Sequence, residues 1–154
     1  MTTFATHLGL PNPGLFASML SRDKLLQRMH LRDWSPAWDL VSSNEIDEAI
    51  GPDVVVKQVD GTGGSGVRLV KRRAPVKDLI GMELSPHRSL LVEEFIPGRD
   101  VSVESLIMSG QVLFENMTEE NNLEYEGSFL EMGYTMGPSI SDSAIAHQLY
   151  ELNR

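Results

Sequence analysis

The chain has no cysteine among its 154 residues. Disulfides, cysteine-ligated zinc and thiol catalysis are therefore excluded, and a reducing cytosol is compatible with this composition. Long apolar runs are also missing: nowhere do about 18 apolar residues follow one another, and the N-terminal stretch lacks the basic and apolar regions of a signal peptide. From these absences we expect a cytoplasmic protein with no membrane partner.

Basic residues are scarce. The chain has 13 Lys and Arg against 22 Asp and Glu, which gives a formal net charge of −9. A general nucleic-acid binder needs basic surface to neutralise phosphates, so the composition argues against this class. The hydrophobic fraction of 41% is that of a folded globular protein. Any anionic ligand would have to be held by local positive charge.

The glycine-rich stretch GTGGSG, residues 61–66, matches the pattern G-x-G-x-x-G. A dinucleotide-binding turn is excluded because residues 67–71 read as a strand rather than a helix. A Walker A loop is excluded because Val67 and Arg68 stand where Lys and Ser or Thr are needed. Two interpretations remain: a glycine-rich hairpin whose backbone N–H groups cover phosphates, or a plain flexible hairpin.

Further elements follow from periodicity and turn residues, and together they indicate an α+β protein with antiparallel strands. An acidic, exposed loop is expected over residues 119–128. We expect helices over residues 16–31, 45–50 and 76–82 and from residue 141 onward, and strands over residues 38–42, 54–59, 67–71, 89–96, 100–108 and 111–118, with a tight turn at Ser109-Gly110.

Four elements in a fixed order resemble the ATP-grasp family: Asp23-Lys24 in an early helix, VVVKQ followed by GTGGSGV, LLVEEFIPGRDVSVE, and the Ser-Gly turn after it. The resemblance runs from about residue 8 to about residue 140. It implies two α+β lobes with antiparallel sheets, namely a small lobe over 16–87 that carries the glycine-rich hairpin and a partial large lobe over 88–154. Residues 1–15 would be an N-terminal linker or helix remnant.

The resemblance also implies an ATP site. Lys24 and Lys57 would contact phosphate oxygens, the backbone from Glu93 to Ile96 would read the adenine, and Asp100 would accept hydrogen bonds from the ribose. The complete set is Lys24, Lys57, Gly61, Gly63, Gly64, Ser65, Gly66, Val67, Glu93, Glu94, Phe95, Ile96 and Asp100.

Each of these residues also has a simpler interpretation. A lysine is more often a solvated surface charge, and Asp100 could be a turn residue. Lys57, however, lies in a run of valines that should be largely buried, so its ammonium needs an anionic partner, for which phosphate suffices. Glu104 would lie opposite Val101 and Val103, either in a groove or in solvent.

The implied reaction is transfer of the γ-phosphoryl group of ATP to a carboxylate, followed by attack of an amine or a similar nucleophile on the acyl phosphate. The family's Mg²⁺ ligands lie downstream of the segment that residues 132–138 resemble. We therefore expect them to be absent from this chain, the C-terminal lobe to be incomplete and the chain alone to be inactive, with no catalytic residue assigned.

Two alternatives remain open for the chain as a whole. One is a non-catalytic nucleotide-binding fragment. The other is a structural module that depends on a partner, either a second copy or missing domains. The four histidines share no metal-ligand spacing, so no metal-binding residue is expected among them.

Overall fold

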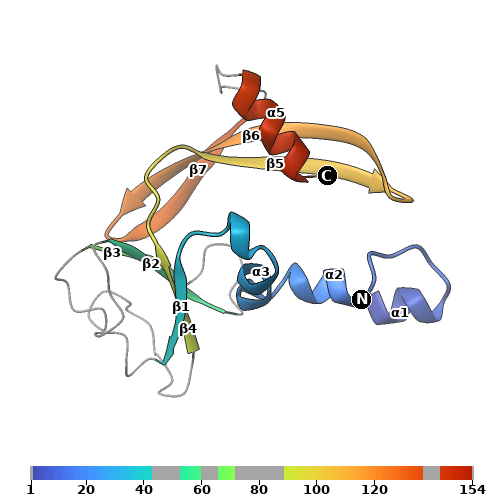
Figure 1. The fold of residues 1–154 in the computed structure, drawn as a ribbon, viewed down its shortest axis with the longest axis horizontal. Coiled ribbons are helices and arrows are strands. Elements are labelled where there is room, and N and C mark those ends of the chain that lie inside the picture. Colours follow the sequence, from blue (N-terminus) through green and yellow to red (C-terminus); the bar gives the residue numbers. More distant parts are fainter. Residues whose placement is uncertain (1, 43–52, 60–65, 72–88, 137–142, 154) are drawn as a thin grey trace. The chain divides into compact units, whose positions relative to one another are not determined.

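The computed structural model describes residues 2–42, 53–59, 66–71, 89–136 and 143–153. The chain forms two compact units, Met1–Ile96 with Glu126–Ser128, and Pro97–Tyr125 with Phe129–Arg154. Helices and two antiparallel sheets are distributed over these units (Figure 1). The expected α+β class with antiparallel sheets is confirmed.

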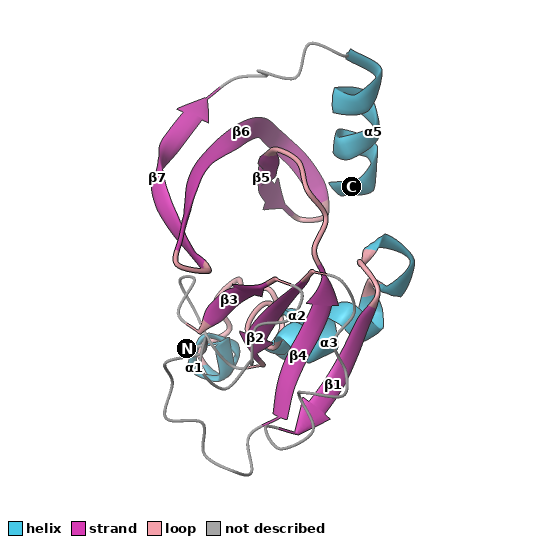
Figure 2. Ribbon diagram, turned by 90° about the vertical axis from the view of Figure 1, so that its left-hand side faces the viewer, coloured by secondary structure: helices cyan, strands magenta, loops and turns pink. Residues whose placement is uncertain are grey.

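The first unit contains a four-stranded antiparallel sheet in the order β1-β4-β2-β3. Its helices precede the sheet in the sequence, and α3 lies against one face of it (Figure 2). The elements are α1 (Thr2–His7), α2 (Leu15–Leu20), α3 (Lys24–His30), the 3-10 helix η1 (Arg32–Trp34), β1 (Trp38–Ser42), β2 (Val54–Gln58), β3 (Val67–Val70) and β4 (Ser89–Glu94).

The single helix expected over residues 16–31 is wrong, because α2 ends at Leu20 and α3 begins at Lys24. Asp23 causes the break. Its backbone is extended, and its carboxylate accepts a hydrogen bond of 2.9 Å from the N–H of Leu26, which caps the start of α3. A capping aspartate between two apolar stretches therefore starts a new helix rather than continuing the previous one.

The core of the first unit lies around β4 and β2. Leu90, Leu91, Val56 and Val70 are fully buried. Because β4 pairs with β1 on one side and β2 on the other, it is an interior strand, and its side chains are covered over four successive positions. Valine suits such strands since its branched side chain packs well on a pleated surface.

The position of β4 bears on the expected lobe boundaries. We expected residue 88 to open the second lobe, whereas β4 is the second strand of the first sheet. It pairs with β1 on one side and with β2 on the other. The identification of the two units with the functional lobes 16–87 and 88–154 stays a prediction.

The second unit contains a three-stranded antiparallel sheet and a helix: β5 (Asp100–Met108), β6 (Gln111–Tyr125), β7 (Ser128–Met136) and α5 (Ser143–Asn153), which packs on β5. The turn at Ser109-Gly110 is confirmed, with positive φ angles of 51° and 74° that suit a tight hairpin. Figure 2 shows β6 bending strongly along its length.

The acidic loop expected over residues 119–128 is wrong, since β6 runs on to Tyr125. Glu119 and Glu120 pair in register with Val101 and Asp100 of β5. Pairing with the neighbouring strands β5 and β7 overrides the poor strand propensity of these acidic residues. The exposed turn is confined to Glu126 and Gly127, both with positive φ.

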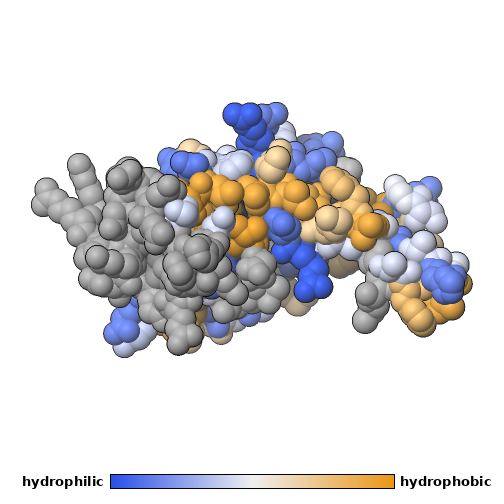
Figure 3. Space-filling view, turned by 90° about the horizontal axis from the view of Figure 1, so that it is seen from below, coloured by the Kyte–Doolittle hydropathy of each residue, from blue (hydrophilic) through white to orange (hydrophobic). Residues whose placement is uncertain are grey.

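Many large apolar side chains of this second sheet are exposed, among them Phe114, Met132, Tyr134 and Met136, whereas Met117 is fully buried. Figure 3 shows apolar surface, in orange, gathered beside polar surface on the face that it displays. None of the described helices has the length and apolarity to cross a bilayer.

Leu91 and Leu40 are cross-strand partners that test the role of the core. Leu91 is 0% exposed and Leu40 39% exposed. We expect Leu91→Ala to lower the free energy of unfolding by about 2–4 kcal/mol, because it leaves a cavity. Leu40→Ala should change it by about 1 kcal/mol or less. Urea denaturation measures both, and equal effects would contradict the placement of the core.

Candidate functional site

Lys57 and Glu93 lie on the same face of the first sheet because of its register. In the β2–β4 ladder Val55 faces Glu93 and Lys57 faces Leu91, so Lys57 and Glu93 are diagonal neighbours. Their side chains are long enough to meet, and Lys57 Nζ lies 2.5 Å from Glu93 Oε2. The sheet register thus forms an ion pair between residues 36 positions apart in the numbering.

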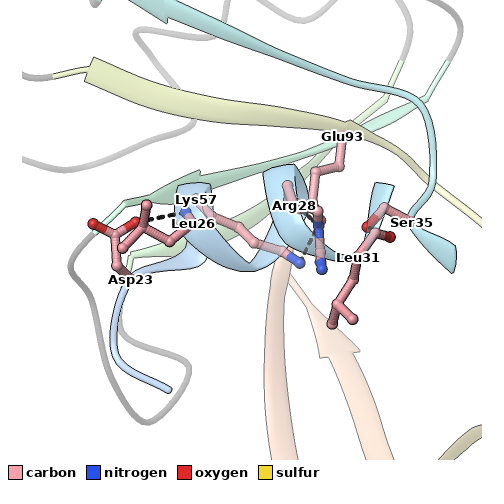
Figure 4. A network of polar contacts seen from close by, with 7 residues as sticks. All are labelled: Asp23, Leu26, Arg28, Leu31, Ser35, Lys57 and Glu93. Atoms are coloured by element: carbon pink, nitrogen blue, oxygen red, sulfur yellow. Dashed lines mark hydrogen bonds and ion pairs between the residues drawn. The ribbon is translucent and has the colours of Figure 1, made fainter. Parts of the chain in front are cut away.

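Arg28 reaches the same carboxylate from α3, through a hydrogen bond of its Nε to Glu93 Oε1 (Figure 4). Three elements therefore contribute to one cluster, which we call the Glu93 cluster: Arg28 from α3, Lys57 from β2 and Glu93 from β4. Glu93 is 3% exposed, while both cations are 21% exposed. The anion is buried and its partners reach the protein surface.

The two cations decide the ionisation of Glu93. Burial alone would raise the pKa of this carboxyl, since it disfavours the charged form. Hydrogen bonds from Arg28 and Lys57, together with their positive charges, outweigh burial and hold the pKa of Glu93 below its usual value. Glu93 is thus a carboxylate at neutral pH, and the cluster of two cations and one anion has a net charge of +1.

Lys24 lies beside the end of β2. It is the first residue of α3, and its backbone N–H, which has no partner within the helix, donates to Val59 O over 3.1 Å. This bond fixes the start of α3 next to the point where β2 leads into the glycine-rich stretch. The structure therefore brings the backbone of Lys24 and the strand of Lys57 together.

Of the predicted glycine-rich loop, Gly61, Gly63, Gly64 and Ser65 lie outside the described residues. Gly66 is described, with a positive φ of 72° that favours glycine. Val67 follows as the first residue of β3 and faces Lys57 in the ladder. Strands do flank the loop on both sides, as the sequence indicated.

The backbone from Glu93 to Ile96 is already partly engaged. Glu93 pairs with β1 and β2, the N–H of Glu94 donates to Ala37 O over 2.8 Å, and the N–H of Phe95 donates to Asp53 O over 3.1 Å. Among the described residues Ile96 has no hydrogen-bond partner. That the backbone of this segment reads the adenine stays a prediction.

Asp100 belongs to the second unit, where it begins β5 and accepts a hydrogen bond of 2.8 Å from Asn122 Nδ2. With Arg99 and Asn122 it lines a hollow of about 480 Å³. Arg99 in turn pairs with Glu119 at 3.5 Å. Asp100 is exposed, and its role toward a ribose stays a prediction.

Glu104, for which a groove or solvent was left open, lines a shallow groove of about 560 Å³ with Thr118 and Tyr134. Its carboxylate accepts hydrogen bonds from Thr118 Oγ1 at 2.7 Å and Ser102 Oγ at 2.8 Å. These bonds hold the pKa of Glu104 below its usual value. The side chain is both exposed and fixed in place.

A magnesium ion needs several oxygen ligands that converge on one point. Among the described residues, no three His, Asp or Glu side chains converge as a metal ion requires. Asn153, which ends α5, instead donates to Ser105 Oγ and to Glu115 Oε1.

The sequence was compared with known protein families. The family model described as ATP-grasp domain matches residues 22–148. The chain belongs to the ATP-grasp family. No curated protein matches it.

Three solved structures illustrate the fold. D-alanine–D-alanine ligase from Bacillus anthracis is 17% identical over 99% of this chain and 53% of its own, with a TM-score of 0.69. L-amino acid ligase from Bacillus licheniformis is 20% identical over 98% of this chain and 36% of its own, with a TM-score of 0.77. N5-carboxyaminoimidazole synthetase from Staphylococcus aureus, complexed with ADP, is 18% identical over 89% of this chain and 37% of its own, with a TM-score of 0.62.

These likenesses establish the fold of this ATP-grasp domain. The chain spans about half or less of the length of each of these solved chains. At such identities the reaction and substrates of those enzymes are not transferred to it.

Two features of the Glu93 cluster were missed from the sequence. The expectation that Lys57 needs an anion is met within the chain, by Glu93 rather than by phosphate alone. Arg28 was not singled out, although it lies four residues after Lys24 and so on the same side of α3. The four-residue spacing from Lys24 was the signal in the sequence that could have identified Arg28. Its partner, Glu93 on β4, depends on a strand register that the sequence does not show.

The ion pairs of Glu93 predict a pH-dependent stability. A carboxyl whose pKa is lower in the folded than in the unfolded chain adds stability above about pH 4.3, which is lost as the pH falls through the folded value. Glu93→Gln should therefore cost about 3 kcal/mol at pH 7, because two partly buried cations lose their anion.

Melting temperatures from pH 7 to pH 3 measure this effect. The difference between wild type and Glu93→Gln should shrink as the pH falls, since protonated Glu93 resembles glutamine. Glu94→Gln, an exposed neighbour on the same strand, is the matched control and should stay close to wild type. A constant difference for Glu93→Gln across this range would contradict the ionised cluster.

Proposed function

We propose that this domain is the ATP-binding part of an ATP-dependent ligase that activates a carboxylate as an acyl phosphate for attack by an amine or a similar nucleophile. The observation that carries the proposal is the Glu93 cluster, which retains positive charge beside the strand that leads into the glycine-rich stretch. Membership of the ATP-grasp family supports it.

The phosphate part of the proposal rests on charge. A chain of net charge −9 repels a triphosphate unless positive charge is held locally. Lys57 has three N–H donors, of which Glu93 occupies one, so the ammonium can donate to a phosphate oxygen as well. Lys24, at the start of α3 near the end of β2, would add a second cation. Positive charge at the strand that leads into the glycine-rich stretch suits a nucleotide's phosphates.

The adenine part of the proposal rests on the backbone. Neighbours take the N–H groups of Glu94 and Phe95, so among the N–H groups of these three residues that of Ile96 would donate to a purine edge. Val67, half-buried at the start of β3, would supply an apolar contact to the nucleotide. Asp100 would accept from the ribose hydroxyls. A solved structure of the Bacillus anthracis ligase complexed with ATP, 16% identical with a TM-score of 0.64, is among the similar structures.

In the proposed reaction these residues bind and orient rather than react. Lysines and backbone N–H groups hold the phosphates so that a carboxylate can approach the terminal phosphorus, which is the main requirement for phosphoryl transfer. Mg²⁺, when bound, would neutralise charge on the phosphates. The described residues include no ligand set for it, so no protein group is assigned to hold the ion.

Isothermal titration with ATP tests the binding step. Lys57→Met should weaken ATP binding about 10- to 100-fold, because a charged hydrogen bond to phosphate is lost. Lys71→Met, which removes an exposed lysine next to β3, is the matched control and should bind like wild type. Unchanged affinity in Lys57→Met would contradict the assignment of that lysine.

Release of ADP in the presence of Mg²⁺ and a panel of carboxylates and amines then tests the chemistry. ADP formation that depends on both a carboxylate and an amine would support the ligase. Tight ATP binding without any ADP release would favour the alternative of a non-catalytic nucleotide-binding domain. No binding of ATP at millimolar concentration would contradict both.

A further inference from the structure

Glu93 poses a problem for the proposed phosphate site, because an ammonium paired with a carboxylate has no net charge to offer an anion. Lys57 alone with Glu93 would be such a neutral pair. Arg28 changes this balance, since it supplies a second cation to the same carboxylate from a different element. The question is what the second cation does for a ligand.

We propose that Arg28 is a positioning residue that neutralises Glu93, so that Lys57 keeps its charge and its remaining N–H groups for a nucleotide's phosphates. Arg28 would thereby set the affinity of the site without touching the ligand. This inference rests on the proposed function, since it assumes that Lys57 binds phosphate. It concerns a residue that the family resemblance did not single out.

The geometry divides the carboxylate between the two cations. Arg28 Nε occupies Oε1 and Lys57 Nζ contacts Oε2 (Figure 4). Because Arg28 occupies Oε1, Lys57 contacts only Oε2, and the negative charge of the carboxylate is shared between the two cations. Without Arg28, both oxygens would be open to Lys57, and the flexible ammonium would satisfy more of its donors on Glu93.

Arginine suits this task for two reasons. Its guanidinium stays charged at any pH relevant to the protein, so the neutralisation of Glu93 does not depend on conditions. Its donors lie in a rigid plane, and the short helix α3 that carries it is fixed at its start by the Asp23 cap and by the bond from Lys24 N–H to Val59 O. The cation is thus held in place by backbone contacts independent of the ligand.

The burial of the carboxylate makes the effect measurable. Glu93 is 3% exposed, so water screens its charge poorly and its negative field acts on Lys57. Loss of Arg28 should therefore weaken ATP binding on the order of tenfold, while ligands without phosphate should be unaffected. A purely structural role of Arg28 would weaken the binding of both ligands alike.

The experiment measures ATP and adenosine affinities by titration for Arg28→Gln, Arg28→Lys, Glu93→Gln and the double variant Arg28→Gln with Glu93→Gln. Arg32→Gln, an exposed arginine four residues further on, is the matched control. Melting curves establish that each variant is folded under the conditions of the titration.

We expect Arg28→Gln to bind ATP about tenfold more weakly and adenosine as wild type does. Arg28→Lys should restore most of the ATP affinity. Glu93→Gln should bind ATP at least as tightly as wild type even though it is less stable. In the Glu93→Gln background, removal of Arg28 should have no further effect on ATP, because there is no carboxylate left to neutralise.

Three results would overturn the inference. Equal weakening of ATP and adenosine by Arg28→Gln would make Arg28 structural. A persistent loss of ATP affinity in the double variant, relative to Glu93→Gln, would mean that Arg28 contacts phosphate directly. Unchanged ATP affinity in Arg28→Gln, with Lys57→Met impaired, would refute the role of Arg28 and leave the proposed function intact.

If Arg28→Gln does not fold, the comparison of Glu93→Gln with the double variant still decides between neutralisation and direct contact. Failure of the wild-type chain to bind ATP at all would instead refute the proposed function, and this inference with it.

Discussion

The buried carboxylate of Glu93 is the constraint on which the first unit depends. An ionised carboxylate that is 3% exposed is costly unless cations surround it, and both of its oxygens are occupied. The cations come from α3 and β2, so the charge fixes the helix on the face of the sheet and fixes the side chains of two neighbouring strands. Apolar packing of Leu91 and Val56 supplies stability, whereas the Glu93 cluster specifies how the helix meets the sheet.

A buried ion pair is not in itself a good source of stability, because desolvation offsets most of the attraction. Here the cluster combines one anion with two cations, and the unbalanced charge is on side chains that are 21% exposed. The second cation gives the cluster a net charge of +1, which the pair of Lys57 and Glu93 alone would not have. An excess cation beside a buried pair suits the anionic ligand that we propose.

Local signals in the sequence predicted most of the strands and the tight turn. Alternating or β-branched runs predicted β1, β2, β3 and β5, and Ser109-Gly110 predicted its hairpin turn. The errors had identifiable causes. The cap made by Asp23 divides a helix whose apolar spacing looked continuous. Pairing with β5 keeps Glu119 and Glu120 extended despite acidic side chains that favour a loop, and β6, which also neighbours β7, runs on to Tyr125. In both cases a hydrogen-bonding partner decided against local propensity.

The candidate site was predictable to the extent that it is local. Recognisable stretches of sequence contain Lys24, Lys57 and the segment from Glu93 to Ile96. The register that places Lys57 diagonal to Glu93, however, joins strands separated by 30 residues. It is fixed only when β4 inserts between β1 and β2. A lysine in a valine-rich strand reveals that an anion is near; it does not reveal how many anions and cations share the space. The charge available to a ligand is the net charge of Arg28, Lys57 and Glu93 together. A lysine in a sequence motif therefore identifies an anion site only when the charged partners that the fold brings to it are known.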